Sequence, residues 1–511
     1  MKVVFRVDAS ERIGSGHLVR CATLAGALRV RGADVLFLCR ALPGAWGDWL
    51  DRQGLRWRDL GPAAGSLAPR AGDPPHAHWL GVTWESDAAD TARALGGERQ
   101  DWLVVDHYAL DARWEQALRP HAQRLLAIDD LADRSHDVDV LLDLNLHADM
   151  ASRYAGRVPA GTRPLLGPRF ALLRPAFATA RAGLAARGQA VQRVLVFFGG
   201  VDAANSTGRV LEALDGLRES GVASFSVDAV IGALHPAREA LQAFCAERSG
   251  WACHVQTERM AELMAAADLA IGAGGGATWE RCALGVPTLA VAQADNQVEQ
   301  VAAAARAGVL CSPQLRDGSA VAWRVPIEAL WFDPLRRAQL AASAAALVDG
   351  RGADRVAQLM ARPPLTVRPA RAEDSEFVHA GRNAEAVRQV SRSPAPIAFD
   401  DHERWYHTVL ANPNRNLLIG CLGDEAVGVL RYDLAADGKR AEVSLYLAPG
   451  RSGLGLGPEL LAAAEAWLRR EQPMVRTLVA EVLAGNSASI HLFEQAGFVA
   501  CSQHFEKGLT P

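Results

Sequence analysis

The sequence predicts an α/β chain with two parallel-sheet domains, followed by a smaller α+β domain. Two observations support this fold class. Short apolar runs alternate with helical patterns from the start of the chain and again from residue 194, as is typical of βαβ units. After residue 362 the apolar runs are instead separated by turn dipeptides, which predict antiparallel hairpins. We therefore expect domains at residues 1–180, 181–362 and 363–511.

The predicted elements follow in order along the chain. In the first domain, the apolar runs that we interpret as strands cover residues 3–7, 35–39, 102–106, 125–129 and 138–143. A loop-rich passage at 161–175 precedes the runs of the second domain at residues 194–198, 227–231, 268–272 and 288–292. Paired prolines at 363 and 364 mark the last boundary, beyond which runs cover residues 417–422, 426–432 and 441–447. We expect two Rossmann-like domains that face a cleft, and then an antiparallel meander.

Composition narrows the class of partner. The chain has a formal net charge of −4, half of its 511 residues are hydrophobic, and no dense Lys/Arg tract is present. These properties argue against nucleic-acid or membrane-surface binding and favour a small-molecule substrate. The 8 cysteines include no Cys-x-x-Cys pair, which fits reduced thiols in a cytoplasmic protein better than disulfides or a metal site. No run of about eighteen apolar residues predicts a transmembrane helix.

The first motif is a glycine turn that ends in a histidine. Gly14, Gly16 and His17 lie between the apolar run at 3–7 and a helical pattern that includes Arg20. Backbone N–H groups and the helix dipole at such a position favour anions and disfavour an imidazolium. A neutral His17 can therefore take a proton from water beside a bound phosphate. Asp8 is either a turn or capping residue, or it orients His17 or binds substrate hydroxyls.

A second glycine-rich turn lies in the predicted second domain. Residues 272–276 follow an apolar run and precede a helical pattern that begins near Thr278, so this turn offers N–H groups to a diphosphate. Glu280 either accepts hydrogen bonds from both hydroxyls of a ribose or complements the dipole of its own helix. Asn205 is either a ligand-binding residue or an N-cap.

These motifs resemble the PseG family, also described as SpsG-like, whose members remove UDP from a UDP-linked trideoxy sugar. The resemblance runs through most of the first 360 residues, with matching segments at 166–175, 198–205, 272–280, 285–287, 296–297 and 349–355. It implies a GT-B fold like that of the glycosyltransferase MurG, with the nucleotide held mainly by the second domain. It also implies substrate contacts at Gly14, Gly16, Arg20, Asn205, Gly274, Gly275, Gly276, Thr278, Glu280, Asn296 and Gln297.

The hydrolysis that this resemblance implies uses His17 as the general base. A water deprotonated by His17 attacks the anomeric carbon, while the amides of the glycine turn stabilise the charge on the departing UDP. Single displacement inverts the anomeric centre, and the scheme requires no metal. Two alternatives stay open: a UDP-sugar glycosyltransferase, and a nucleotide-sugar-binding protein with inactive sites.

The third domain carries two further motifs. Residues 449–461 combine several glycines with Pro458 in the first turn of a helical pattern, and the segment 486–498 is a helical pattern that ends in Gly497 and Phe498. In this order the motifs resemble the acetyl-CoA loop and the second signature of the GNAT acetyltransferases. The resemblance implies acetyl-CoA as co-substrate, bound by Leu445, Leu447, Ser452, Gly453, Leu454, Gly455, Leu456, Gly457, Asn486 and Phe493.

The chain departs from the GNAT pattern at two positions. Ser452 stands where the loop usually has Arg or Gln, and Phe493 stands where many members have a tyrosine general acid. Period-2 alternation puts Glu442, Ser444 and Tyr446 on one face of the strand at 441–447. We therefore expect Glu442 as the base and Tyr446 as the acid of acetyl transfer.

The segment that contains Arg382 and Asn383 resembles the substrate side of PseH-type acetyltransferases, which acetylate the 4-amino group of a UDP-amino sugar. Similarity to both enzyme types suggests a bifunctional enzyme for consecutive steps of pseudaminic acid biosynthesis. The sugar of a legionaminic acid precursor and an unrelated acceptor, such as a protein N-terminus, are the alternatives. Surface charge and core packing are the ordinary explanation for the side chains of this segment.

Overall fold

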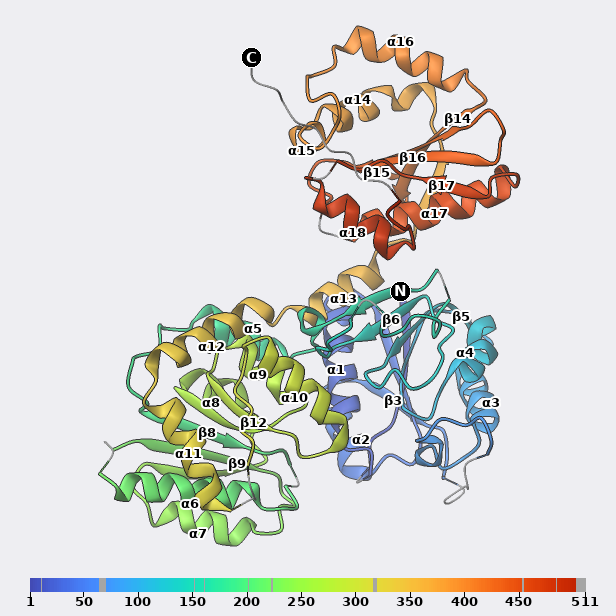
Figure 1. The fold of residues 1–511 in the computed structure, drawn as a ribbon. Helices are drawn as coiled ribbons and strands as arrows, with labels where there is room; N and C mark the ends of the chain where they lie inside the picture. The colour runs from blue at the N-terminus through green and yellow to red at the C-terminus, as the bar shows by residue number, and fades with distance from the viewer. Residues whose placement is uncertain are drawn as a thin grey trace, which may run out of the picture. The chain divides into compact units, whose positions relative to one another are not determined.

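The computed structural model describes residues 1–10, 12–63, 70–150, 152–159, 161–200, 202–221, 224–315, 319–452, 455–483 and 485–501. The chain divides into two compact units, Met1–Ala361 and Arg362–Pro511 (Figure 1). The first unit contains two sheets, and we call each sheet with its helices a lobe. No helix among the described residues is long and apolar enough to cross a membrane.

The first lobe is built on a seven-stranded parallel sheet in the order β3-β2-β1-β4-β5-β6-β7. Its strands are β1 (Lys2–Val7), β2 (Asp34–Cys39), β3 (Arg56–Asp59), β4 (Gln100–Asp106), β5 (Ala122–Ile128), β6 (Val140–Asp143) and β7 (Arg163–Leu166). The strand order reverses between β1 and β4, which is the switch point of a doubly wound fold. The sequence did not predict β3 and β7, because these are short edge strands, one of them rich in charge.

Helices cover both faces of this sheet. Val3 and Phe5 pack under α1 (Gly16–Arg29), α2 (Gly44–Arg52) and α13 (Gly352–Ala361). Val4 points to the other face, under α3 (Trp84–Leu95) and α4 (Ala112–Leu118). The helix α13 comes from the far end of the unit, and Trp102 Nε1 donates to its Met360 carbonyl at 2.9 Å. The first unit also contains the short 3₁₀ turns η1 (Ala77–Trp79), η2 (Arg119–His121) and η3 (Pro168–Phe170).

The second lobe has a five-stranded parallel sheet in the order β10-β9-β8-β11-β12, whose switch point lies between β8 and β11. The strands are β8 (Arg193–Phe197), β9 (Ser226–Ile231), β10 (Trp251–Val255), β11 (Leu269–Ala273) and β12 (Thr288–Val291). One core includes α6 (Ser206–Glu219), α7 (Arg238–Ala246) and α11 (Ala320–Trp331). The other includes α5 (Pro175–Ala182), α8 (Met260–Ala266), α9 (Ala277–Ala283) and α10 (Asp295–Arg306), and α12 (Pro334–Leu347) contributes to both.

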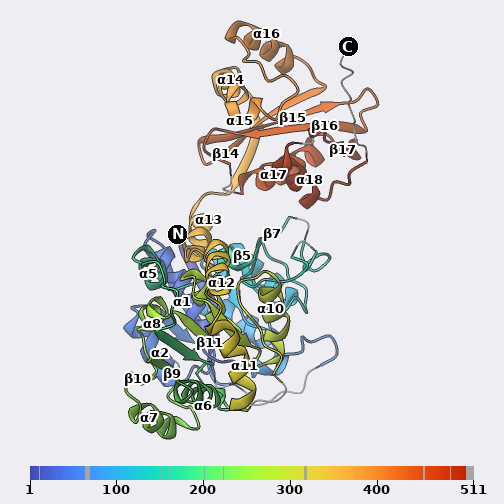
Figure 2. The ribbon, with the colours of Figure 1, turned by 60° about the vertical axis from the view of Figure 1, so that its left-hand side comes forward.

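The second unit is an α+β domain with the sheet order β13-β14-β15-β16-β17. The predicted meander is confirmed, because β14 (Arg415–Leu422), β15 (Glu425–Leu434) and β16 (Arg440–Leu447) pair antiparallel. The edges are β13 (Leu365–Pro369), antiparallel to β14, and β17 (Thr477–Val479), parallel to β16. Both views show α14 (Ser375–Asn383), α15 (Glu385–Arg388) and α16 (Phe399–Leu410) on one side of the sheet, and α17 (Leu456–Glu471) and α18 (Ser487–Gln495) on the other (Figures 1 and 2). A 3₁₀ turn, η4 (Ala372–Asp374), precedes α14.

The predicted fold class is confirmed: two Rossmann-like parallel sheets precede an α+β domain. The predicted boundaries of the three domains stay a prediction.

Candidate functional site

Aspartates gather where the parallel strands of the first lobe end. Asp8 follows β1, Asp106 ends β4, Asp130 lies just after β5, and Asp143 ends β6. The carboxyl ends of parallel strands share one edge of a sheet, and ligands of doubly wound folds bind at this edge beside the switch point. His17 lies in the first turn of α1, which follows β1. The first site residues are therefore brought together at the β1/β4 switch point.

His17 forms a hydrogen-bonded pair with Asp106. The distance from His17 Nδ1 to Asp106 Oδ1 is 2.6 Å, and Arg20 donates to both carboxylate oxygens of Asp106, from Nε and Nη2, at 2.6 Å each. Burial alone would raise the pKa of Asp106, but the Arg20 charge and these hydrogen bonds hold that pKa well below its usual range. An ionised Asp106 places the proton of neutral His17 on Nδ1. The other ring nitrogen, Nε2, is then the one that can accept a proton.

Tyr108 and Asp130 complete the surroundings of His17. The Tyr108 ring meets the His17 ring edge-on, with 4.6 Å between centroids, and its hydroxyl donates to Asp130 at 2.6 Å. Arg20 reaches the other oxygen of Asp130 with Nη1 at 3.2 Å. Sequence reasoning missed Asp106, Tyr108 and Asp130. The signal for Asp106 was its position at the end of an apolar run.

The expected orientation of His17 by Asp8 is corrected by the structure. The carboxylate of Asp8 is 4% exposed and accepts two hydrogen bonds from Arg6, at 2.5 and 2.9 Å, and a third from the Arg40 amide at 2.7 Å. His107 Nε2 lies 3.3 Å from it. These partners occupy the carboxylate, so Asp8 stabilises the start of the turn while Asp106 orients His17.

The glycine turn before α1 leaves the first amides of the helix uncapped by side chains. Gly14 adopts a left-handed conformation with φ of +77°, and its amide donates to the Ser10 carbonyl at 2.8 Å. The N-cap Ser15 makes no side-chain capping hydrogen bond, and the helix begins at Gly16. N–H groups at the start of this 14-residue helix are therefore oriented toward the space beside His17 in the manner of an anion-binding turn.

The second glycine turn lies at the carboxyl end of β11. A Cβ at Gly272 would approach the Phe197 carbonyl oxygen to 2.0 Å, and Gly275 has a φ of +86°, so both positions require glycine. The Gly274 amide donates to the Val291 carbonyl. No acceptor among the described residues pairs with the amides of Gly275 and Gly276, so these two N–H groups remain for a ligand. Gln297 of α10 lies against the turn, 3.4 Å from where a Gly275 Cβ would be.

Glu280 follows the glycine turn on α9. Its side chain is 21% exposed, and its nearest cation is Arg174, with 3.8 Å between Nη2 and Oε1. Burial raises the pKa of Glu280, and the Arg174 charge offsets this only in part. A loosely paired, partly exposed carboxylate is able to accept hydrogen bonds from a ligand.

Two predicted substrate contacts are corrected. The Asn205 side chain is the N-cap of α6, where its Oδ1 accepts from the Gly208 amide at 3.2 Å. Thr278 is 2% exposed, its hydroxyl accepts from Arg281 at 3.3 Å, and its amide donates to the Gly275 carbonyl at 2.9 Å, so this residue holds the turn together instead. Asn296 is exposed on α10, and its role stays a prediction.

A chain of hydrogen bonds connects the two lobes. Trp279 of α9, which is 2% exposed, donates through Nε1 to Asn145 Oδ1 at 3.0 Å. Asn145 Nδ2 donates in turn to Asp130 Oδ2 at 3.4 Å, the oxygen that Arg20 also contacts. Trp279, which is next to Glu280 in sequence, is thus connected through Asn145, Asp130 and Arg20 to Asp106, the partner of His17.

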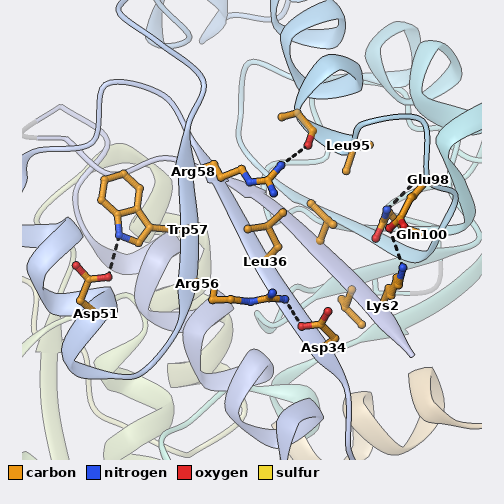
Figure 3. Close-up of a pocket in the computed structure, with 13 residues that line it drawn as sticks. Lys2, Asp34, Leu36, Asp51, Arg56, Trp57, Arg58, Leu95, Glu98 and Gln100 are labelled. Carbon is orange, nitrogen blue, oxygen red and sulfur yellow. Dashed lines mark hydrogen bonds and ion pairs between the residues drawn. The ribbon is translucent and has the colours of Figure 1, made fainter.

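A pocket of about 490 Å³ lies at the opposite edge of the first sheet (Figure 3). Lys2, Asp34 and Gln100 begin β1, β2 and β4, so this pocket is at the amino ends of the strands. Its charged groups pair with each other: Lys2 with Glu98 at 2.7 Å, and Arg56 with Asp34. The switch-point residues do not line it, so we place no function there.

In the second unit, the edge of β16 is open where the GNAT resemblance places acetyl-CoA. β17 pairs with β16 only from Arg440 to Glu442, whereas β16 continues to Leu447. From Val443 onward no described strand pairs with this edge, so its amides and carbonyls are available to an extended ligand. Glu442 is exposed at the point where the two strands separate.

Three predicted residues of this unit make structural contacts instead. The Tyr446 hydroxyl donates to the Val378 carbonyl of α14 at 2.9 Å, and burial raises its pKa, so it is not placed as an acid. Asn383 donates to the Ile397 carbonyl at 2.9 Å and accepts from the Ile397 amide at 2.8 Å, which ties down the 384–397 segment. Arg382 donates to the Ser393 carbonyl at 3.3 Å.

The remaining predicted cofactor residues lie around α17 and α18. Ser452 is an exposed residue of the loop, Gly453 and Leu454 lie outside the described residues, and Gly455 is the N-cap of α17. Asn486 caps α18, and Phe493 packs on Phe498 at 4.9 Å between ring centroids. The side chains of Leu445, Leu447, Leu456 and Phe493 belong to the apolar core, and Gly457 allows α17 to approach Leu492. Among the described residues, no group of three or more His, Cys, Asp or Glu side chains is placed to hold a metal ion.

The fold and its two glycine turns define a two-lobed Rossmann-like unit joined to an α+β domain. Residues 364–499 match the family described as acetyltransferase (GNAT) domain. The N-terminal region is similar to the spore coat polysaccharide biosynthesis protein SpsG of Bacillus subtilis, with 29% identity over 276 residues, 52% of this chain and 78% of that protein. The chain is therefore a fusion of an SpsG-like region with a GNAT domain.

Two further comparisons concern the same N-terminal region. The UDP-2,4-diacetamido-2,4,6-trideoxy-beta-L-altropyranose hydrolase of Campylobacter jejuni is 29% identical over 178 residues, which cover 35% of this chain and 53% of the hydrolase. Among solved structures, MurG of Acinetobacter baumannii aligns with 70% of this chain and 99% of its own, at 15% identity and a TM-score of 0.48.

Proposed function

We propose that the chain is a bifunctional nucleotide-sugar enzyme of pseudaminic acid biosynthesis. The first unit hydrolyses UDP-2,4-diacetamido-2,4,6-trideoxy-β-L-altropyranose to the free sugar and UDP. The GNAT domain uses acetyl-CoA to acetylate the 4-amino group of the preceding UDP-amino sugar. The observation that carries the hydrolase assignment is the His17–Asp106 pair at the β1/β4 switch point, in a chain whose N-terminal region matches such a hydrolase with 29% identity over 178 residues.

The geometry at the two edges supports the following hydrolytic step. His17 Nε2 takes a proton from water, the water oxygen bonds to the anomeric carbon, and the bond between this carbon and the UDP oxygen breaks. Asp106 holds the Nδ1 proton and stabilises the imidazolium that forms. The Gly275 and Gly276 amides stabilise the departing diphosphate, and Glu280 binds the ribose. Single displacement yields the inverted sugar.

The acetyl-transfer step is supported by the open edge of β16. The acceptor nitrogen attacks the thioester carbonyl, the bond to sulfur breaks, and Glu442 takes the proton from nitrogen, directly or through water. Because Phe493 replaces the usual tyrosine and Tyr446 bonds to α14, water protonates the leaving thiolate. Two consecutive activities on one chain raise the local concentration of the shared intermediate.

The test is incubation of the purified chain with acetyl-CoA and the UDP-4-amino sugar, followed by mass spectrometry and UDP assay. The expected result is an acetylated nucleotide sugar that then gives free sugar and UDP in equal amounts. UDP release only with an added sugar acceptor would make the first unit a glycosyltransferase. Binding of acetyl-CoA and the nucleotide sugar without turnover would indicate a binding protein with inactive sites. A nucleotide sugar that stays unacetylated would indicate that the GNAT domain acetylates another acceptor. A legionaminic-type substrate offered in parallel decides the stereochemistry.

A further inference from the structure

Arg281 is a buried arginine directly behind the second glycine turn. It is 1% exposed, and Nη2 donates to the Ala273 carbonyl at 2.7 Å and to the Thr278 hydroxyl at 3.3 Å. Ala273 ends β11 and Thr278 lies in the first turn of α9, so one guanidinium joins the two ends of the glycine turn. Gly272 makes room for it, because a Cβ there would lie 3.3 Å from Arg281 Nη1.

The described part of the chain provides no ion-pair partner for this cation. No carboxylate of the described residues lies within ion-pair distance of Arg281, and the neighbouring Glu280 contacts Arg174 instead. The buried Nε of Arg281 has no hydrogen-bond partner in the described part of the chain. Burial lowers the pKa of Arg281 to about 10, so the group is still charged at neutral pH. A buried charge without a partner destabilises a fold strongly, which calls for a compensating role.

Two other arginines of the second lobe, the half-buried Arg187 and the buried Arg337, show how such a cation is ordinarily compensated. Arg187 donates to the Ala267 carbonyl, at the end of α8, and to the Gly285 carbonyl, each at 2.8 Å. Arg337 donates to the Leu330 carbonyl at 2.7 Å and to the Trp331 carbonyl, both at the end of α11. Helix ends with exposed carbonyls favour cations, whereas helix starts disfavour them. Arg281 differs from both, because its contacts lie at the start of α9.

We propose that Arg281 is a positioning residue that supplies the buried counter-charge for a diphosphate at the glycine turn 274–276. The inference rests on the proposed function and deepens it by stating how the leaving group is held. Arg281 fixes the ends of the turn, and its charge acts on the diphosphate through a water-poor interior, where electrostatic interactions are stronger than in water. As the glycosidic bond breaks, negative charge develops on the phosphate oxygen, and the same cation stabilises this charge.

The test is calorimetric binding of UDP, uridine and inorganic pyrophosphate to the full chain. In the Arg281→Gln variant we expect the affinities for UDP and pyrophosphate to fall on the order of tenfold or more, with uridine affinity unchanged within about twofold. Arg281→Lys keeps the charge and should recover much of the diphosphate affinity. Arg337→Gln is the matched control, since it removes a buried arginine of the same lobe; it should lower thermal stability and leave all three affinities unchanged.

The outcomes separate this inference from the proposed function. Equal losses for uridine and UDP in Arg281→Gln would show a merely structural role and overturn the inference, as would unchanged UDP affinity. If the parent binds pyrophosphate but not UDP, the proposed nucleotide is wrong. The inference about Arg281 is then decided by whether Arg281→Gln lowers the affinity for pyrophosphate. A parent that binds neither overturns the inference. If Arg281→Gln does not fold, Arg281→Lys decides, because loss of the preference for UDP over uridine despite a retained charge contradicts the proposal.

Discussion

The carboxyl edges of the two sheets contain equivalent switch points but carry different kinds of chemical group. In the first lobe the edge consists of charged side chains in close pairs, such as His17 with Asp106 and Asp8 with Arg6. In the second lobe it consists of glycine amides, a loosely paired Glu280, and Arg281, whose Nε has no partner among the described residues. Paired side chains fix the position and protonation of a base, whereas open amides beside a cation fit an anion. One fold, used twice, thus supplies the two kinds of group that the proposed hydrolysis requires.

The largest expected effect removes the base from the first edge. Replacement of His17 by Asn should lower kcat for UDP-sugar hydrolysis by about 10²–10⁴-fold, because the variant lacks the imidazole that we propose takes the proton from water. UDP affinity, which depends on the second edge, should stay within about twofold by calorimetry. The matched control is His254→Asn, which breaks another His–Asp pair, 2.8 Å from Nε2 to Asp228 Oδ1, on β10. Normal turnover in the His17 variant would contradict the assignment.

The next effect comes from the residue that orients the base. In Asp106→Asn the side-chain amide can donate to His17 Nδ1, which moves the imidazole proton to Nε2 and removes the acceptor. We expect kcat to fall on the order of 10²-fold with UDP affinity retained. Nitrogen NMR of the His17 ring checks the cause directly, since it distinguishes the two tautomers. A slow variant that keeps the proton on Nδ1 would show that Asp106 acts in another way.

The third prediction concerns the charge pairs behind the first edge. His136 Nδ1 lies 2.7 Å from Glu115 Oε1, and Nε2 lies 3.6 Å from Asp129 Oδ2. Burial alone would lower the pKa of His136, but the two carboxylates raise it from 6.5 to about 9. The folded state therefore binds a proton more tightly than the unfolded state. This contributes about 3 kcal/mol of stability.

The sign of the pH dependence follows from the raised pKa of His136. Its stabilising contribution is complete below pH 6.5 and is lost as the pH rises through about 9. In Glu115→Gln this contribution should shrink, so the urea midpoint of the segment 100–143, followed by pulse proteolysis, should fall at pH 6 and change less between pH 6 and 9.5 than in the parent. Glu262→Gln, which breaks the exposed pair with Arg259 in the second lobe, is the control and should change neither value appreciably. A parent-like pH profile in Glu115→Gln would contradict the expected coupling.

The comparison also explains which parts of the site the sequence could predict. The His17 turn and the turn at 272–276 each follow an apolar run and contain glycines, so local pattern was sufficient to find them. Asp106 lies 89 residues from His17 in the chain. Their pairing depends on β1 lying beside β4, and the apolar pattern does not contain this strand order. The sequence analysis left open whether Asp8 orients His17, whereas the fold brings the distant Asp106 to this histidine.

The same limit applies to the second unit. Period-2 alternation predicted the strand that carries Glu442 and Tyr446, but the bond between the Tyr446 hydroxyl and the Val378 carbonyl depends on how α14 packs. Asn383 is similar, because its partner Ile397 lies beyond a segment without a periodic pattern. Arg281 shows the reverse case: its position beside Glu280 was visible, whereas its burial and missing partner are properties of the folded lobe alone.

The smallest expected effect concerns Glu280, the carboxylate of α9 that follows the second glycine turn. If Glu280 binds the ribose, Glu280→Gln should weaken UDP binding by about tenfold and weaken binding of 2′-deoxy-UDP less, because the deoxy nucleotide has only one of the two hydroxyls that donate to this carboxylate. Burial raises the pKa of Glu280, so in the parent the preference for UDP over 2′-deoxy-UDP should decline as the pH falls through that raised value, and in the variant it should not. If Glu280 only complements the dipole of α9, the variant should lose about 0.3–1 kcal/mol of stability and keep the parent's preference. Calorimetry with both nucleotides at two pH values distinguishes a second edge that binds only the diphosphate from one that also recognises the ribose.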